Sequence, residues 1–241
     1  MRRADKNKLW IIVSISLLFF LAGCVDTGVQ VIPSTISYTS QVKIVNLAAG
    51  MGTANVTMKT KNGSTITFSS IAFGDESPVT TVPAGSKTLS ITYSGGGNDN
   101  NLQVVTETDY KMRLYLVGNA SGRTLIKGVS RYIFQTSADT NIYKKGVAQI
   151  SFFNGSPNYN LSAVAAVLGS DTTDLGIASL ASGEGSKTFT ELTPGNYTFI
   201  LTSGEDGSTS TITVSLSEKA RYILVAYDDK SSLKTKVLTD D

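Results

Sequence analysis

Side chains that catalyse reactions by nucleophilic attack or by proton transfer near neutral pH are scarce in this sequence. Its 241 residues include no histidine and a single cysteine, Cys24. A Ser-His-Asp or Cys-His arrangement therefore cannot be built from this chain, and the common zinc sites lack their ligands. Cys24 also has no partner for an intrachain disulfide. We expect no enzymatic activity and no cofactor.

Paired carboxylates are the remaining groups that could perform acid–base chemistry. The candidates are Asp75-Glu76, Asp171 with Asp174, and Glu205-Asp206. All three lie in loop-like or hairpin-like segments, so solvated turns explain them more simply than catalysis does. Asn98-Asp99-Asn100 offers oxygen atoms to Ca²⁺, but it lacks the spacing and the glutamate of an EF-hand loop. The sequence therefore predicts no catalytic and no metal-binding residues.

The N-terminus has the pattern of a secretory signal peptide. Residues 1–8 carry four basic side chains against one acidic one, and residues 9–22 are almost continuously apolar. This apolar run is shorter than the roughly 20 residues that a spanning helix needs. A basic segment, a short apolar segment and small residues at the cut describe a signal peptide. We expect residues 1–23 to be removed.

Leu21-Ala22-Gly23-Cys24 resembles the bacterial lipobox. The resemblance implies that the signal peptidase recognises Leu21, Ala22 and Gly23, and that Cys24 is acylated and becomes the new N-terminus. Stable anchoring takes at least two acyl chains, and a triacylated cysteine exceeds that requirement. We expect a lipid-anchored protein of the bacterial cell envelope. Val25 replaces the aspartate that retains enterobacterial lipoproteins in the inner membrane, so the resemblance favours the outer membrane.

The charge of the mature chain differs from that of the precursor. The full sequence has 21 basic and 19 acidic residues, and cleavage removes four basic and one acidic residue, leaving 17 against 18. The mature formal charge is thus 17 − 18 = −1. The mature chain has no excess of positive charge that would attract nucleic acid, so nucleic acid is not an expected partner.

The composition after the signal peptide predicts an all-β protein. Residues 24–40 contain Gly, Pro and Ser and are expected to form a tether, spanning roughly 20–25 Å as a flexible coil. The alternative is that residues 35–40 already pair with a sheet. From residue 41 onward, short alternating segments rich in Val, Ile and Thr are separated by Gly and Asn turns. About seven such strands in residues 41–135 predict a β-sandwich.

The same pattern then repeats, and the repeat defines the domain organisation. Val42 aligns with Ile150 at an offset of 108, and Leu89 aligns with Phe199 at an offset of 110. The final strand is aligned at an offset of 108 again, through Leu125 with Leu233. A period near 110 residues has the size of a whole domain. We predict two tandem sandwiches, immunoglobulin-like or prealbumin-like, over residues 41–135 and 146–241.

Two residue pairs are predicted to lie at equivalent places in the two cores. Their members in the first copy alternate with Ser and Thr along a strand, and their members in the second copy follow a Pro-Gly turn. These pairs are Leu89 with Phe199 and Ile91 with Leu201. In the second copy, Pro194-Gly195 precedes a strand in which Tyr197, Phe199 and Leu201 share one face. We interpret this motif as a turn entering a core strand, and we expect each half to fold separately.

Two copies of a strand ending in Asn46 or Asn154, each followed by a Pro-Gly or Pro-Ala-Gly turn, resemble a bacterial family of secreted and lipid-anchored proteins. It is the domain-of-unknown-function family numbered forty-three ninety-seven. The resemblance would cover residues 41–241 in two units, but it supplies no catalytic residue. The Asp/Pro-rich stretch that the family has after its first strand is replaced here by residues 47–52 and 155–160.

The sequence favours a non-catalytic scaffold or docking role in the cell envelope. The lipid anchor, the duplication and the missing catalytic groups motivate this hypothesis. Its partner is an unidentified envelope protein or glycan, besides the membrane itself. The alternative is a surface lipoprotein that binds a glycan or peptide through the loops of the distal domain.

Overall fold

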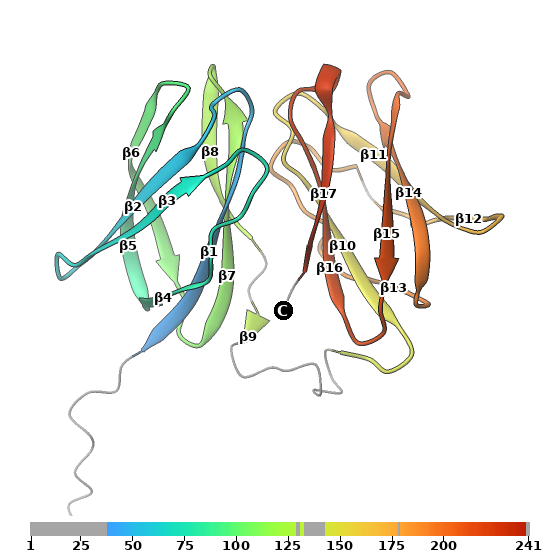
Figure 1. Cartoon of the computed structure of the whole chain (residues 1–241), viewed down its shortest axis with the longest axis horizontal. Helices are drawn as coiled ribbons and strands as arrows, with labels where there is room; N and C mark the ends of the chain where they lie inside the picture. The colour runs from blue at the N-terminus through green and yellow to red at the C-terminus, as the bar shows by residue number, and fades with distance from the viewer. Residues whose placement is uncertain (1–37, 129–130, 133–142, 178, 240–241) are drawn as a thin grey trace, which may run out of the picture. The chain divides into compact units, whose positions relative to one another are not determined.

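The computed structural model describes residues 38–128, 131–132, 143–177 and 179–239. The predicted signal peptide, Cys24 and nearly all of the predicted tether lie outside the described residues. Tyr38–Asp241 forms one compact unit, and the description below concerns this unit alone. Its described residues form β-strands and one short 3-10 helix, η1 (Lys230–Ser232) (Figure 1).

The first half of the unit forms two facing sheets. Its strands are β1 (Thr39–Ala48), β2 (Ala54–Thr60), β3 (Thr65–Ile71), β4 (Thr80–Pro83), β5 (Gly85–Tyr93), β6 (Asn98–Thr106), β7 (Tyr110–Asn119), β8 (Gly122–Lys127) and β9 (Arg131–Tyr132). Inner sheet 1 has the order β4-β1-β7-β8, with β9 also paired to β7, and outer sheet 1 has the order β3-β2-β5-β6. β1 begins at Thr39, two residues before the predicted start of the first sandwich.

The second half repeats this arrangement. Its strands are β10 (Ala148–Asn154), β11 (Leu161–Leu168), β12 (Asp171–Asp174), β13 (Thr190–Leu192), β14 (Gly195–Ser203), β15 (Thr209–Leu216), β16 (Arg221–Tyr227) and β17 (Lys234–Thr239). Inner sheet 2 has the order β13-β10-β16-β17, and outer sheet 2 has the order β12-β11-β14-β15. The prediction of an all-β fold with two sandwiches is confirmed.

The strand order distinguishes both copies from a constant-type immunoglobulin domain. In a constant-type immunoglobulin domain the first strand pairs with the second. Here β1 pairs with β4 and, in parallel, with β7, whereas β2 belongs to the other sheet. β10 pairs with β13 and β16 in the same way. Neither copy therefore has the constant-type immunoglobulin order, and the prealbumin-like topology stays a prediction.

The strand registers confirm the internal repeat and correct its last part. Val56 faces Ile91 in the first copy, and Val164 faces Leu201 in the second. Since Ile91 and Leu201 are counterparts, so are Val56 and Val164, and the first two strands of each copy keep the offset of 108. In the segment after the third strand the offset is 109, since Glu76 bridges Val45 and Gly185 bridges Phe153, and from β4 and β13 through the last strand it is 110. There Leu114 faces Lys127, and its counterpart Leu224 faces Val237. The predicted alignment of Leu125 with Leu233 is wrong by two residues, because alternation repeats every second residue and cannot distinguish such a shift.

Three apolar cores hold the four sheets together. One cluster fills the space between the two sheets of the first half, and a second fills the second half. The predicted core pairs are confirmed, since Leu89, Phe199, Ile91 and Leu201 are at most 1% exposed. The third cluster, called the central cluster below, joins inner sheet 1 to inner sheet 2. Its buried members are Val45, Leu47, Tyr115, Val117, Phe153, Ile223, Val225 and Leu238.

Both inner sheets are thus covered on both faces, and their central strands show the corresponding composition. β7 contains Leu114-Tyr115-Leu116-Val117, and β16 contains Ile223-Leu224-Val225-Ala226. Within each run alternate residues point to the sandwich core and to the central cluster. Parallel strands buried on both faces typically have such continuous apolar runs.

A buried asparagine closes the loop after the first strand of each copy. Nδ2 of Asn46 donates to the carbonyl oxygens of Gly52 and Ile71, at 2.9 and 3.0 Å. Nδ2 of Asn154 donates to the carbonyl oxygens of Tyr159 and Leu180, at 2.5 and 2.9 Å. The asparagine that defines the repeated sequence motif therefore satisfies backbone groups that would otherwise be buried unpaired.

Asn154→Ala is expected to destabilise the protein by at least about 2 kcal/mol, because each buried polar group left unpaired costs roughly 1–3 kcal/mol. Urea unfolding followed by circular dichroism measures this change. Asn196→Ala, at an exposed position of β14, is the matched control and should change stability by less than about 0.5 kcal/mol. Equal effects of the two substitutions would contradict the role assigned to Asn154.

Candidate functional site

The sequence-predicted site residues fall into two groups. Leu21, Ala22, Gly23 and Cys24 lie outside the described residues, so their role in lipidation stays a prediction. The acidic residues considered as catalytic pairs are described. Asp171 and Asp174 are the first and last residues of the exposed strand β12. Oδ1 of Asp174 accepts a hydrogen bond from the Gly176 amide.

In the Asn98-Asp99-Asn100 segment, the Asp99 carboxylate forms an ion pair with Arg123. Both carboxylate oxygens of Asp99 bind Arg123, with Nε and Nη2 at 2.9 and 3.0 Å. This bidentate pair joins the β5–β6 hairpin to the β7–β8 hairpin, and the guanidinium carbon also lies 5.2 Å from the centre of the Tyr93 ring. The carboxylate that a Ca²⁺ ion would need is therefore bound to a cation. Across the described residues no cluster of three or more acidic, histidine or cysteine side chains could hold a metal.

The tip of the β14–β15 hairpin is stabilised in the same manner. Nζ of Lys230 lies 3.2 Å from Glu205 Oε2 and 2.9 Å from Asp206 Oδ2. Hydrogen bonds from Lys230 and Ser208 hold the pKa of Asp206 well below its usual value. Both acids are thus bound by one cation, an arrangement that stabilises a turn and keeps the Asp206 carboxylate ionised.

Lys87 is a buried titratable side chain that the sequence analysis did not single out. It points into the first sandwich, is 2% exposed, and donates from Nζ to the Gly85 carbonyl oxygen at 3.0 Å. Burial lowers the pKa of its ammonium group. Tyr197 occupies the equivalent position of the second copy, and its hydroxyl lies 2.9 Å from Thr193 Oγ1. In both copies the polar end of this inward-pointing side chain therefore binds a residue two to four positions earlier, at the turn that leads into the strand.

The central cluster brings an aromatic pair together across the two inner sheets. The rings of Tyr115 and Phe153 stack with their centres 4.1 Å apart and an interplanar angle of 17°. Leu47 packs against bare backbone, because a Cβ on Gly155 would lie only 2.5 Å from Leu47 Cδ1. These contacts join the two sandwiches through a well-packed apolar interface.

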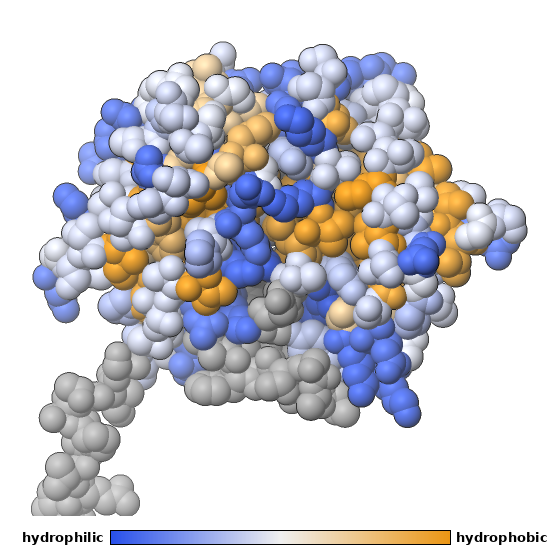
Figure 2. Space-filling view, viewed as in Figure 1, coloured by the Kyte–Doolittle hydropathy of each residue, from blue (hydrophilic) through white to orange (hydrophobic). Residues whose placement is uncertain are grey.

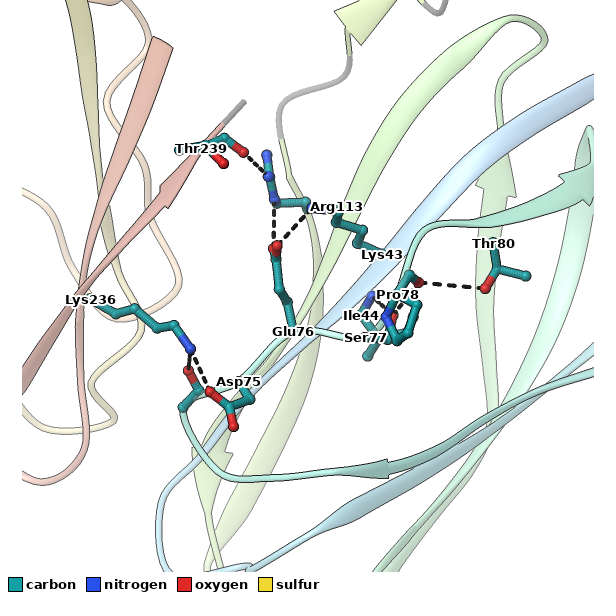
Figure 3. A network of polar contacts seen from close by, with 11 residues as sticks. Lys43, Ile44, Asp75, Glu76, Ser77, Pro78, Thr80, Arg113, Lys236 and Thr239 are labelled. Carbon is teal, nitrogen blue, oxygen red and sulfur yellow. Dashed lines mark hydrogen bonds and ion pairs between the residues drawn. The ribbon is translucent and has the colours of Figure 1, made fainter. Parts of the chain in front are cut away.

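A polar network borders the central cluster on one side (Figure 3). Glu76 lies 2.7 Å from Lys43 Nζ and 3.3 Å from Arg113 Nε. Arg113, whose side chain is 6% exposed, also donates to the carbonyl oxygen of Thr239 in β17. The network therefore binds the last strand of the second copy to the first copy.

Lys236 makes a second polar link between the copies. Its Nζ donates to the Gly74 carbonyl oxygen at 2.7 Å and lies 2.5 Å from Asp75 Oδ1 (Figure 3). Asp75 and Glu76 thus bind different cations in different directions. They are adjacent in sequence, but they do not form the carboxylate pair that acid–base catalysis would need.

Two hollows share residues 185–187 of their lining. A groove of about 560 Å³ follows the loop between β12 and β13, where Leu175, Ile177, Glu184 and Lys187 line it. A narrower slot of about 290 Å³ lies between the two inner sheets, over Tyr115 and Phe153. Gly185, Ser186 and Lys187 line both hollows.

The described surface carries few large apolar side chains. Those that are exposed are Tyr38, Val79, Val105 and Leu168. Figure 2 shows apolar residues interleaved with polar ones on the face that it presents. In the part of the chain that the structure describes, no helix has the length and apolarity needed to span a membrane.

Glu76→Gln is expected to destabilise the protein by about 2 kcal/mol, because it removes the ion pairs that Glu76 makes with Lys43 and with the nearly buried Arg113. Removing one partner of a fully buried ion pair costs roughly 3–5 kcal/mol, and the partial exposure of Glu76 reduces this figure. Thermal and urea unfolding measure the change. Asp171→Asn, at an exposed site without an ion-pair partner among the described residues, is the control. Indistinguishable unfolding of the two variants would contradict the stabilising role of the network.

No protein-family model matches the sequence, and no curated protein matches it either. Among solved structures, the C-terminally truncated tip fimbrial protein Mfa3 of Porphyromonas gingivalis matches at 10% identity, over 84% of this chain and 99% of that one, with a TM-score of 0.29. Candidate cell adhesion proteins of Bacteroides fragilis and Bacteroides uniformis match at 8% and 9% identity, cover 83% and 87% of this chain and 98% and 99% of theirs, and have TM-scores of 0.30 and 0.29. Likeness at these TM-scores carries no argument, and the resemblance to family forty-three ninety-seven stays a prediction.

Proposed function

We propose that this chain is a lipid-anchored protein of the bacterial cell envelope with a non-catalytic role as a scaffold or docking body. The observation that carries the proposal is the central cluster, an apolar core that fixes one sandwich against the other. Interfaces between domains of one chain are usually more polar than obligate ones, and relative motion of the domains is then the default. An apolar interface bordered by ion pairs instead favours a single rigid body that presents its loops at fixed positions.

The chemistry of the described surface supports a docking role rather than catalysis. The acids of the three candidate pairs are bound by Lys236, Arg113 or Lys230, or lie exposed in β12. Such groups stabilise turns and the interface between the sandwiches. Turnover of a defined envelope substrate by the purified mature chain would contradict the non-catalytic part of the proposal.

The anchor is the part of the proposal that rests on the sequence. Acylation of Cys24 would attach the chain to a membrane, with the outer membrane favoured by Val25. Residues 25–38 would then connect the lipid to β1, which begins at Thr39. The partner of the docking surface would be another envelope protein or a glycan.

Cys24→Ser is expected to abolish lipidation, because the hydroxyl of serine does not replace the thiol that carries the first acyl chains. The variant should leave the membrane fraction or accumulate as an uncleaved precursor, and mass spectrometry should find no acyl chains. Thr27→Ser, three residues further on, is the control and should remain membrane-bound. Unchanged mass and unchanged membrane partition of Cys24→Ser would refute the anchor.

A further inference from the structure

The interface between the two inner sheets is built from equivalent strands, but its two sides differ. Lys43 faces Arg113 across β1 and β7, and their counterparts Ser151 and Ile223 face each other across β10 and β16. The segment after the third strand is also repeated. Glu76 forms a bridge with Val45, and Gly185 forms the same bridge with Phe153. The triad Lys43–Glu76–Arg113 on one side thus corresponds to Ser151, Gly185 and Ile223 on the other.

The small side chains of the second side leave space. Where Glu76 reaches between two cations in the first copy, Gly185 has no side chain, and the slot of about 290 Å³ opens over Gly185, Ser151 and Ile223. Ile126 and the Tyr115–Phe153 stack supply further apolar wall. The slot is therefore the position of a carboxylate side chain that the second copy lacks.

The charge at the edge of the slot also favours an anionic group in this place. Lys187 lines it, is exposed, and has no ion-pair partner among the described residues. The other lysine of the lining, Lys127, is paired with Glu107. The Ser151 hydroxyl also retains hydrogen-bonding capacity, because its contact with the Tyr222 carbonyl oxygen is long, at 3.5 Å. An apolar slot with an uncompensated cation at its edge favours a ligand that is apolar at one end and anionic at the other.

We propose that this slot binds a small carboxylate with an aromatic or branched apolar body. The apolar body lies against Ile126, Ile223 and the aromatic stack, and the carboxylate reaches Lys187. Ligand sites usually measure about 300–1,000 Å³, and a slot of about 290 Å³, just below this range, suits a single ring with a short acidic arm. The proposal does not depend on the lipid anchor, and failure of the Cys24→Ser experiment would leave it unaffected.

The test uses 3-phenylpropionate and its uncharged analogue 3-phenylpropanamide as probes. Each is titrated into the mature chain produced without signal peptide and lipid, and two-dimensional NMR records the amide shifts. Saturable shifts at Gly185, Ile126 and Ile223 are expected, with the carboxylate binding at least about fivefold more tightly than the amide. Absence of saturable shifts at these residues up to about 20 mM probe would overturn the proposal.

Gly185→Glu restores the side chain that the first copy has at this place and should fill the slot. A Cβ at Gly185 would meet its nearest neighbours at 3.4 Å, an ordinary contact, so the substitution fits the backbone. We expect at least about tenfold weaker binding of 3-phenylpropionate. Gly122→Glu adds the same charge where a Cβ meets nothing within 4 Å, and should bind like the unmodified chain. Unchanged binding to Gly185→Glu would overturn the proposal.

Lys187→Gln tests the charge separately and decides the matter if Gly185→Glu fails to fold. Lys187 is exposed, so its replacement should leave the amide spectrum of the fold unchanged. We expect the preference for the carboxylate over the amide to disappear, whereas Lys145→Gln, at another exposed lysine, should retain it. A preference that survives in Lys187→Gln would show that Lys187 does not bind the carboxylate and would contradict the proposed site.

Discussion

The structure depends on one constraint, which is that the central strands of both inner sheets are apolar on both faces. β1, β7 and β16 each send one set of side chains into a sandwich core and another set into the central cluster, to which β10 adds Phe153. An outer sheet covers only one of these faces. The second face has to be removed from water by another surface, and the equivalent face of the other copy fulfils this role. Duplication of the sandwich therefore supplies both halves of an interface that neither copy could leave exposed.

Polar contacts at the border of this interface specify how the copies are joined. An apolar surface alone is non-directional, whereas ion pairs and hydrogen bonds require defined partners. Glu76 between Lys43 and Arg113, and Lys236 on Gly74 and Asp75, connect the β3–β4 loop of the first copy with β17 of the second. Among the residues that the structure describes, no comparable polar network fills the equivalent place near Gly185, where the slot lies instead.

Much of the fold could be predicted from local patterns. Alternation placed Leu89 and Phe199 in the cores, and the repeat length gave two sandwiches. The parallel pairing of β1 with β7 could not be predicted, because it joins strands about 70 residues apart and has no local sequence signal. A signal for the central cluster did exist. The runs Leu114–Val117 and Ile223–Ala226 do not alternate, and strands without alternation are typical of sheets covered on both faces.

The candidate sites were less predictable for a physical reason. Asp75, Glu76 and Asp99 stand out in the sequence as acids in loops, but their cations come from strands far away along the chain, so the pairing appears only in the fold. The slot depends on the absence of a side chain at Gly185. Such an absence becomes informative only when the register identifies Gly185 as the counterpart of Glu76. The lipidation signal is the opposite case, since it is read entirely from a short sequence motif.

The central claim is that the apolar interface makes the two sandwiches one body. It is tested most directly by inserting a recognition site for a specific protease after Thr136, cutting the folded chain there, and measuring the mass of the eluting species by gel filtration with light scattering. The account predicts that the two fragments co-elute at the mass of the uncut chain and separate only in denaturant. Two separately eluting folded fragments under native conditions would show that the interface does not hold the sandwiches together.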